Sequence, residues 1–488
     1  MKLLELLKGI EISGTLQVPD MQIKGITLDS RNVKPGFLFI AVKGEKADGH
    51  EFISCAKSAG AAAVLTQKKL KENDIYAVHV PDTRDAMAKI ARNFYKEPDK
   101  DINLVGITGT NGKTTVSYMV HKILQQIDEM TGMIGTIHHN ICGNSIESKN
   151  TTPEAIDIYG MIDQIRKCNG EHLVMEVSSH ALALKRVAGL KFNVAAFTNL
   201  SRDHMDFHKN EADYFECKSR LFKENLKENG TAVINKDDAH GRILLAKQSN
   251  ALTFGWESRG KNDVYVRTCE YGRNFTKVTL GSPCGDLDIK TSLMGMHNIY
   301  NLMAGAACAC ALNVNPELII KGLEELKCVP GRFESINAGQ PYSIIVDYAH
   351  TPQALELLLK AAKEITRGRI ICVFGCGGDR DMGKRSIMGK VVSSQADLVI
   401  VTSDNPRTED PDSIINMVLE GVDKDKSPIV IADRQEAIYK AVNSACPEDC
   451  VIIAGKGHED YQIIGSKRIH FDDREVVKNA VMGKTICA

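Results

Sequence analysis

Residues 105–115 combine three glycines with a lysine that two threonines follow directly, and this combination predicts a phosphate-binding loop. The residues involved are Gly106, Gly109, Thr110, Asn111, Gly112, Lys113, Thr114 and Thr115. Glycines let backbone N–H groups approach phosphate oxygens, and a lysine at this place reaches the outer phosphates. The hydroxyl group directly after the lysine is suited to Mg²⁺. The predicted ligand is therefore a nucleoside triphosphate with its metal ion.

The flanking residues predict a strand before this loop and a helix after it. Residues 104–107 form a short β-branched run. Apolar side chains then recur at helical spacing, at Val116, Met119, Val120, Ile123, Leu124 and Ile127. The standard loop has glycine where this chain has Ile107, so the loop is a variant. A glycine-rich turn before a core helix is the alternative, but it would leave the Lys-Thr pair unexplained.

A second candidate site begins at Glu176, a carboxylate near the end of the apolar run 173–177. Burying a carboxylate is costly unless a cation meets it. In a nucleotide enzyme the natural cation is Mg²⁺, which seeks oxygen ligands. The alternative is a surface glutamate at a strand end.

Polar residues also follow the predicted strand 195–200. His204 and His208 stand four residues apart, but no third soft ligand follows at metal spacing, which argues against zinc. Open α/β sheets place ligands at the carboxyl ends of their strands, where this cluster lies. Further on, Lys218 lies in a predicted amphipathic helix and is expected to be solvated. Asn298 and Asn301 share one face of another predicted helix, where they cap it, pack, or hold a nucleotide base.

Residues 331–488 alternate strand-like and helical patterns, which predicts a parallel, Rossmann-like sheet. The strand-like runs are 343–346, 369–374, 398–402, 428–431 and 451–454. Four runs end in polar clusters, at 347–352, 375–380, 403–407 and 455–459. Four clusters at one edge of a sheet indicate a ligand there. The glycine spacing at 375–378 does not match the dinucleotide fingerprint, which argues against a redox dehydrogenase.

Composition places the chain among globular proteins of several domains. Its 488 residues suggest about three domains, and 43% of them are hydrophobic and 25% charged. The net charge of −1 gives no support for a nucleic-acid or membrane-surface partner. No apolar run approaches membrane-spanning length, and the first residues are too charged for a signal peptide. The fourteen cysteines contain no Cys-x-x-Cys pair, so reduced thiols in the cytoplasm are expected.

The predicted fold class is α/β with three domains. Residues 1–99 form a small α/β domain, residues 100–330 a central parallel sheet of the phosphate-loop ATPase kind, and residues 331–488 the Rossmann-like sheet. Within the central domain, residues 264–289 alternate in β fashion and predict an antiparallel addition.

Six segments together resemble the Mur ligases of bacterial cell-wall synthesis. They read Gly-Thr-Asn-Gly-Lys-Thr-Thr, Met-Glu-Val-Ser-Ser-His-Ala-Leu, Asp-His-Met-Asp-Phe-His, Asp-Tyr-Ala-His-Thr-Pro, Asp-Asn-Pro-Arg and Gly-Lys-Gly-His-Glu. The resemblance spans nearly the whole chain in the family's order. It implies an ATP-dependent ligase that joins meso-diaminopimelate to UDP-N-acetylmuramoyl-L-alanyl-D-glutamate through an acyl phosphate. We expect a cytoplasmic monomer with no nucleic-acid partner and no membrane span.

The resemblance also implies which residues hold the UDP-linked substrate and ATP. The substrate residues would be Leu28, Ser30, Glu45, Lys46, Ala47, Thr151, Thr152, Ser178 and Arg186. The chain departs from the family at Leu184, where relatives often have glutamine. ATP would be bound by residues 109–115 together with Asn298, Arg332, Asp347 and His350. Metal ligands would be Thr114, Glu176, His204 and Lys218, the lysine as a carbamate, and the catalytic residues would be Lys113, Lys218, His204, Arg332 and His350.

The pocket for the incoming amino acid is implied in the last domain. Its residues would be Arg380, Asp404, Asn405, Pro406, Arg407, Gly455 and Glu459. An arginine supplies a two-pronged donor for a carboxylate. Diaminopimelate has a second carboxylate that lysine lacks, so Arg407 favours diaminopimelate.

Three alternatives remain open from sequence. A lysine-adding ligase of the same family differs in the amino acid that triggers phosphate release. A folylpolyglutamate-synthase-like enzyme shares the phosphate loop but lacks the N-terminal domain for UDP. A non-catalytic nucleotide-binding switch would have no use for the four polar clusters of residues 331–488.

Overall fold

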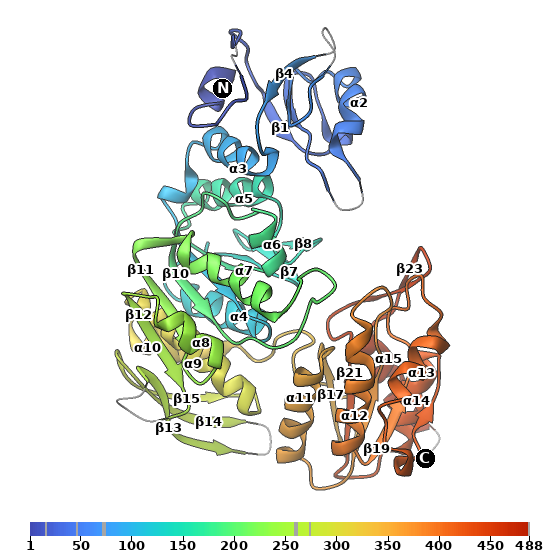
Figure 1. The fold of residues 1–488 in the computed structure, drawn as a ribbon. Coiled ribbons are helices and arrows are strands. Elements are labelled where there is room, and N and C mark those ends of the chain that lie inside the picture. Colours follow the sequence, from blue (N-terminus) through green and yellow to red (C-terminus); the bar gives the residue numbers. More distant parts are fainter. Residues whose placement is uncertain (15–16, 45–46, 71–74, 258–261, 273–274, 487–488) are drawn as a thin grey trace. The chain divides into compact units, whose positions relative to one another are not determined.

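The computed structural model describes residues 1–14, 17–44, 47–70, 75–257, 262–272 and 275–486, and these form two compact units. The first unit contains Met1–Thr108, Ile127–Ala196 and Glu216–Ala232. The second contains Gly109–Gln126, Phe197–Phe215 and Val233–Ala488. Helices alternate with parallel strands in both units (Figure 1), which confirms the α/β class. The predicted domain boundaries after residues 99 and 330 stay predictions.

The chain begins with a sheet of four parallel strands in the order β1-β2-β3-β4. The strands are β1 (Gly25–Thr27), β2 (Phe37–Ile40), β3 (Ala63–Thr66) and β4 (Tyr76–His79), and the helices are α1 (Leu3–Leu6), α2 (Ile53–Ser58) and α3 (Thr83–Phe94). Phe39 and Val64 from the strands pack against Ile53 and Ala56 from α2. This core confirms the small α/β fold predicted for the first residues.

In the rest of the first unit, the strand that precedes the phosphate loop lies in the middle of a row of strands. The order is β10-β5-β9-β6-β7-β8. The elements are β5 (Asn103–Thr108), β6 (Gly132–Ile134), β7 (His138–Ile141), β8 (Asn144–Glu147), α5 (Ala155–Lys167), β9 (His172–Glu176), α6 (Ser179–Ala183) and β10 (Phe192–Phe197). Strands β5 and β9 are parallel, and Ile107 is the register partner of Glu176. Helix α7 (Glu211–Lys223) and strand β11 (Leu226–Asn235) follow in the chain.

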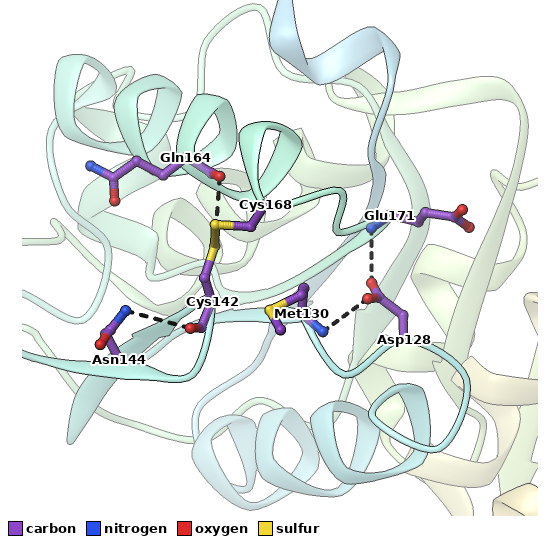
Figure 2. Close-up of a disulfide and its surroundings, with 7 residues drawn as sticks. All are labelled: Asp128, Met130, Cys142, Asn144, Gln164, Cys168 and Glu171. Carbon is purple, nitrogen blue, oxygen red and sulfur yellow. Dashed lines mark hydrogen bonds between the residues drawn. A yellow bond between two sulfur atoms is a disulfide. The ribbon is translucent and has the colours of Figure 1, made fainter.

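A disulfide joins Cys142, in the turn between β7 and β8, to Cys168 at the end of α5 (Figure 2). The prediction of reduced thiols is therefore wrong for this pair. Their sequence separation of 26 hides the pairing from any search for closely spaced cysteines. The free cysteines among the described residues are Cys55, Cys217, Cys269, Cys284, Cys308, Cys310, Cys328, Cys372, Cys376, Cys446 and Cys450.

In the second unit, the helix that follows the phosphate loop packs against helices from much later in the chain. Helix α4 (Lys113–Leu124) contacts α9 (Met296–Ala311) and α10 (Pro316–Glu325). The other elements are α8 (Ala239–Leu245), β12 (Ala251–Gly255), β13 (Val264–Tyr271), β14 (Thr276–Ser282) and β15 (Gly285–Thr291). Strands β13, β14 and β15 are antiparallel, which confirms the predicted addition.

The remaining residues of the second unit form a sheet with the order β16-β17-β21-β18-β19-β20. Its strands are β16 (Glu334–Ser335), β17 (Ser343–Asp347), β18 (Ile370–Phe374), β19 (Leu398–Val401), β20 (Ile429–Val430) and β21 (Cys450–Ala454). All of them pair in parallel except the edge strand β16. The polar clusters that follow β17, β21, β18 and β19 therefore lie at one edge of neighbouring strands, as predicted.

Helices cover both faces of this last sheet (Figure 1). Helices α11 (Pro352–Ile365), α12 (Arg385–Gln395) and α13 (Pro411–Leu419) pack on one face. Helices α14 (Arg434–Ser444) and α15 (Asp473–Ile486) pack on the other. A short hairpin of β22 (Tyr461–Ile464) and β23 (Lys467–His470) precedes α15. Two covered faces of a parallel sheet are the doubly wound arrangement, so the Rossmann-like prediction is confirmed.

We expect thiol titration of the denatured, unreduced protein to find two fewer thiols than titration after reduction. Peptide mapping should assign the missing pair to Cys142 and Cys168. A Cys142→Ser/Cys168→Ser variant should give equal thiol counts before and after reduction. It should also unfold at a lower temperature, because it loses the disulfide that restricts the unfolded chain. Equal counts for the unmodified protein would contradict the pairing.

Candidate active site

The phosphate loop is held in place by the segment that follows β10. The Thr110 N–H donates to the Asn199 carbonyl oxygen at 2.9 Å, and the Asn111 N–H donates to Asn199 Oδ1 at 2.9 Å. Thr198 Oγ1 donates to the Asn111 carbonyl oxygen at 2.6 Å. Sequence reasoning missed this function of Asn199, although the residue lies at the predicted polar end of a strand. These hydrogen bonds fix the shape of the loop.

Two loop glycines are required by their surroundings. Gly109 has φ +146°, and a Cβ there would collide with Thr198 Oγ1. Gly112 has φ +86°, and a Cβ there would lie 2.5 Å from Asn301 Oδ1. Asn301 in turn donates to Asn298 Oδ1 at 3.1 Å, and both side chains are buried. The asparagine pair therefore packs against the loop, and a contact of Asn298 with a nucleotide base stays a prediction.

Lys113 opens helix α4 and bends back onto its own loop. Its Nζ donates to the carbonyl oxygens of Gly109 at 3.0 Å and Thr110 at 2.8 Å. Thr114 and Thr115 follow it in the first turn, and each is 4% exposed. The predicted strand, glycine loop and helix are all confirmed. An ammonium group placed on the concave side of such a loop can neutralise phosphate oxygens.

Arg332 reaches this loop from the end of the central segment. Its Nη2 donates to Thr114 Oγ1 at 3.2 Å, and its guanidinium carbon lies 4.4 Å from the centre of the Tyr348 ring. A guanidinium over an aromatic face is stabilised by the ring's quadrupole. Among the described residues, the buried Nε of Arg332 has no hydrogen-bond partner. The structure thus joins two residues predicted for ATP from distant parts of the sequence.

Asp347 and His350 lie beside Tyr348, at the carboxyl end of β17. The Asp347 carboxylate accepts the N–H groups of Phe333 at 2.6 Å and Ala349 at 2.7 Å. Burial raises the pKa of Asp347 above its usual value, and Arg332 opposes this. Burial also lowers the pKa of His350 to about 4, so its imidazole is neutral near pH 7.

His204 lies on the segment that supports the phosphate loop. It has φ +56°, its side chain is 41% exposed, and its Nε2 lies 3.5 Å from Asp203 Oδ2. Burial disfavours ionisation of Asp203, but His204, His350 and Lys384 nevertheless lower its pKa to about 2. These electrostatic effects place His204 and His350 around one buried carboxylate. His208, by contrast, is buried against the Tyr214 ring, with centroids 4.9 Å apart.

In the first unit, Glu176 is completely buried at the end of β9. Its Oε1 accepts the Thr136 N–H at 2.7 Å and its Oε2 accepts the Thr136 hydroxyl at 3.0 Å. A Cβ on Gly135 would lie 2.6 Å from Oε1. The surface-glutamate alternative is therefore wrong. Sequence offered no signal for Thr136, because 40 residues separate it from its partner.

Thr152, Ser178 and Arg186 are brought together around the loop that precedes α5. The Thr152 hydroxyl donates to the Glu176 carbonyl oxygen at 2.8 Å and accepts the Ser178 N–H at 3.1 Å. Arg186 donates to the Thr152 carbonyl oxygen at 3.0 Å and to Glu154 Oε1 at 2.9 Å. Glu154, which sequence reasoning missed, therefore fixes the arginine predicted to bind substrate.

Glu154 also accepts a hydrogen bond from Arg84, at the start of α3. Arg84 Nη1 donates to Glu154 Oε2 at 3.1 Å and to the Leu184 carbonyl oxygen at 3.3 Å. Leu184, where relatives often have glutamine, thus accepts a hydrogen bond from Arg84 through its backbone carbonyl oxygen. Thr151 pairs its hydroxyl with Thr136 at 3.1 Å.

The residues predicted to hold the UDP group are only partly described. Leu28 and Ser30 flank Asp29 after β1, and Ala47 is exposed, whereas Glu45 and Lys46 lie outside the described residues. Hydrogen bonds from Arg31 lower the pKa of Asp29, and Lys149 lowers it further. Lys149 therefore places the loop that leads to Thr151 within electrostatic reach of this region. No hydrogen bond of the described residues joins Leu28 or Ser30 to Thr151, Thr152 or Arg186.

Lys218 is 1% exposed in the middle of α7. The expectation of a solvated lysine is therefore wrong. A buried ammonium group is costly unless it is paired or chemically neutralised. Conversion to a carbamate, which the family resemblance implies, stays a prediction.

In the last sheet, Asn405 and Glu459 meet although they follow different strands. Asn405 Nδ2 donates to Glu459 Oε2 at 2.9 Å. Lys456, which is completely buried, donates to the same oxygen at 3.2 Å and to Asn405 Oδ1 at 3.3 Å. Asp404, also buried, raises the pKa of Glu459 together with the larger effect of burial. Asn405 and Glu459, both predicted for the pocket, are thus joined by a hydrogen bond. Lys456 bonds to both and was not among the predicted pocket residues.

Arg407 and Arg380 both lie near Gly377. A Cβ on this glycine would lie 2.9 Å from Arg407 Nη1 and 3.9 Å from Arg380 Cγ. Both guanidinium hydrogen bonds of Arg407 in the described part of the chain use Nη1, to the Gly378 carbonyl at 2.7 Å and the Asn405 carbonyl at 3.5 Å. Its remaining N–H groups can form the two-pronged donor that a carboxylate accepts. Pro406, which stands between Asn405 and Arg407 in the sequence, is buried.

Gly455 completes this edge of the sheet. It has φ +116°, and a Cβ there would lie 2.6 Å from Asp404 Oδ2. Its N–H donates to the Asp347 carbonyl oxygen at 3.0 Å. A side chain at this position would be strained and would push the acidic residue away, so glycine keeps the backbone close to Asp404.

The donor atoms at hand suit Mg²⁺. Glu176 in the first unit and Thr114 in the second each carry a buried side-chain oxygen, the kind of ligand that hard cations such as Mg²⁺ prefer. Within the described ranges there is no group of three or more His, Cys, Asp or Glu side chains that could hold a metal ion.

Comparison with known families accounts for these clusters together. Three family models match: "Mur ligase family, catalytic domain" over residues 22–95, "Mur ligase middle domain" over residues 107–309, and "Mur ligase, glutamate ligase domain" over residues 331–457. The chain belongs to the Mur ligase family. It is therefore a ligase, and its α/β architecture is that of the Mur ligases.

Similar Mur ligases are found across bacteria. UDP-N-acetylmuramoyl-L-alanyl-D-glutamate--2,6-diaminopimelate ligase of Gloeobacter violaceus is 42% identical over 484 residues, 99% of this chain and 98% of the relative. The enzyme of the same name from Alkaliphilus metalliredigens is 43% identical over 490 residues, 98% and 97% of the two chains.

Solved structures lead to the same family. A structure of a ligase with that name is 33% identical, with a TM-score of 0.69 and coverage of 99% of both chains. The MurF ligase of Thermotoga maritima in complex with ADP is 22% identical, has a TM-score of 0.65 and covers 95% of this chain and 96% of its own. At that identity it shows the Mur ligase fold alone.

We expect acid to destabilise the protein partly through His139 on β7. The Gly135 N–H donates to His139 Nδ1 at 3.4 Å, and burial, with a smaller effect of His138, lowers the pKa of His139 to about 4. The unfolded imidazole has a pKa near 6.5, so the stabilisation is complete above this value and is lost as the pH falls from about 6.5 to 4.

The check is the midpoint of thermal unfolding between pH 7.5 and 5. His139→Asn can keep an acceptor for Gly135 but cannot gain a proton, so its midpoint should fall less over this interval. The matched control, His79→Asn on β4, should follow the unmodified protein. Equal falls for His139→Asn and the unmodified protein would refute the assignment.

Proposed function

We propose that this protein is the ATP-dependent ligase that adds meso-2,6-diaminopimelate to UDP-N-acetylmuramoyl-L-alanyl-D-glutamate. The observation that carries the proposal is the joint presence of a hydrogen-bonded phosphate loop, contacted by Arg332, and a charged pocket at residues 404–407 and 455–459. The names of relatives that are about 42% identical over the full chain support the choice of substrates.

The chemistry would proceed in two steps. The γ-phosphoryl group of ATP passes to the D-glutamate side-chain carboxylate, forming an acyl phosphate and ADP. The amine of diaminopimelate then attacks the acyl carbon, the C–O bond to phosphate breaks, and the amine loses a proton as the amide forms. Phosphoryl transfer depends on positioning and charge neutralisation, which loop N–H groups, Lys113 and Arg332 are suited to provide.

Several finer roles belong to the same proposal. Mg²⁺, held by Thr114 and Glu176 and by His204 and a Lys218 carbamate, would neutralise phosphate charge. Asp347, Asn298 and His350 would contribute to the nucleotide site. Thr151, Thr152, Ser178 and Arg186 would hold the dipeptide part of the first substrate, and Leu28, Ser30 and residues 45–47 its UDP part.

The setting of the reaction is also part of the proposal. We expect a monomer of three domains, divided near residues 99 and 330, that works in the cytoplasm with no nucleic-acid partner. None of the described helices has the length and apolar character needed to cross a membrane. Most thiols in that compartment are reduced, so the Cys142–Cys168 disulfide would be an exception there.

A coupled assay of ADP and phosphate release tests the function. With ATP, Mg²⁺ and UDP-N-acetylmuramoyl-L-alanyl-D-glutamate present, we expect turnover with meso-diaminopimelate and much less with lysine. Preference for lysine would favour the lysine-adding relatives. Nucleotide binding without ADP release, when all three substrates are present, would favour a non-catalytic switch.

Substituting the predicted carboxylate ligand should separate amino-acid binding from ATP binding. For Arg407→Ala we expect the KM for diaminopimelate to rise roughly tenfold or more, because a hydrogen-bonded charge pair is lost, while the KM for ATP stays unchanged. Arg468→Ala is a matched control, because Arg468 is an exposed arginine stacked on the Tyr461 ring of the neighbouring hairpin. Equal increases of both KM values in Arg407→Ala would contradict the assigned role.

A further inference from the structure

Lys456 is a lysine with no exposed surface at the carboxyl end of β21. Burying an ammonium group costs several kcal/mol unless its hydrogens are bonded and its charge is matched. Its Nζ donates to Asn405 Oδ1 and Glu459 Oε2, and it lies 5.4 Å from the centre of the Tyr461 ring. The cluster of Lys456, Asn405 and Glu459 is therefore built around this charge.

Asn405 makes the cluster rigid. The residue is 2% exposed, and its Oδ1 accepts the Ile463 N–H at 2.9 Å as well as the lysine. Because Oδ1 is an acceptor, Nδ2 must point the other way, where it donates to Glu459 Oε2. The residues after β19 and β21 and the β22 strand thus fix one oxygen of the carboxylate.

The second carboxylate oxygen is left for another partner. Both side-chain hydrogen bonds to Glu459 in the described part of the chain go to Oε2, and the side chain is 15% exposed. An anionic oxygen that is partly exposed and fixed in orientation suits a charged N–H donor.

The charges around Glu459 oppose one another. Burial is the largest effect and raises the pKa of its carboxyl group, Asp404 raises it further, and Lys456 and Asn405 lower it. Glu459 in turn raises the pKa values of Tyr348, Tyr461 and Arg434 by charge. Lys456 is therefore the cation bonded directly to a carboxylate whose burial and whose neighbour Asp404 both favour the protonated form.

We infer that Lys456 is a positioning residue for the amino-acid pocket: with Asn405 it keeps Glu459 ionised and oriented, so that the second oxygen of Glu459 binds an ammonium group of the incoming diamino acid. The inference rests on the proposed function for the role of Glu459 as a substrate ligand. It assigns to Lys456 an effect on substrate binding that passes through Glu459 alone.

The test is the pH dependence of the KM for diaminopimelate in Lys456→Met. Without the cation, the pKa of Glu459 should rise further, so the KM should increase most at the acidic end of the profile, roughly tenfold or more, and return toward the normal value as the pH is raised. The KM for ATP should not change. An unchanged KM for diaminopimelate, or an increase that is the same at every pH, would overturn the inference.

A second variant keeps the test decisive if Lys456→Met does not fold. Lys456→Met/Glu459→Gln removes both charges, so no carboxylate is left buried without its partner. Its KM for diaminopimelate should equal that of Glu459→Gln alone, because Lys456 acts only through Glu459. A clearly higher KM in the double variant would show that Lys456 has another role.

Two controls separate this inference from the proposed function. Lys467→Met changes an exposed lysine of the neighbouring hairpin and should leave all KM values unchanged. If the unmodified protein releases no phosphate with diaminopimelate, the proposed function fails. If it does so and Lys456→Met keeps the normal KM and pH profile, the inference about Lys456 fails alone.

Discussion

Charged side chains that end buried parallel strands need partners, and the supply of these partners shapes both units. Glu176 ends β9 without any exposure, and a threonine from another loop donates to both of its oxygens. Lys456 follows β21 and is matched by a carboxylate and an amide. A charge taken out of water without such partners would cost several kcal/mol. The loops at these strand ends are therefore constrained by electrostatics as much as by apolar packing.

A further pair of buried charges in the last sheet also needs to be matched. Arg434 and Asp473 are completely buried and form a two-pronged pair of 2.8 and 2.7 Å. Arg434 also donates to the Ala454 carbonyl oxygen at 3.0 Å, directly before Gly455. The starts of α14 and α15 are thus tied to the end of β21, so the backbone that carries the amino-acid pocket rests on a fixed support.

Sequence patterns predicted the elements and the ligand-facing positions, since these depend on local rules. Glycine spacing located the phosphate loop, and alternating strands and helices gave the parallel sheet with its polar edge. The supporting contacts depend on proximity in space. Asn199 lies 88 residues from Asn111, and Cys142 and Cys168 lie in different elements, so no spacing rule joins either pair. Lys218 was misjudged for the same reason, because helical spacing alone did not reveal that its face is buried.

The charge pattern of the last pocket itself argues for a substrate that carries both signs. Besides the larger effect of burial, Glu459 and Asp404 raise the pKa of the Tyr461 hydroxyl and Arg468 and Arg407 lower it, so two anions and two cations surround one small region. A ligand whose far end carries both a carboxylate and an ammonium group would neutralise both Arg407 and Glu459. Lysine lacks this second carboxylate and would leave the guanidinium edge desolvated without a partner. Sites built to bond a polar group reject analogues without it far more strongly than apolar pockets reject a missing methylene. Discrimination between diaminopimelate and lysine would therefore come from the cost of an unmatched charge rather than from the size of the pocket.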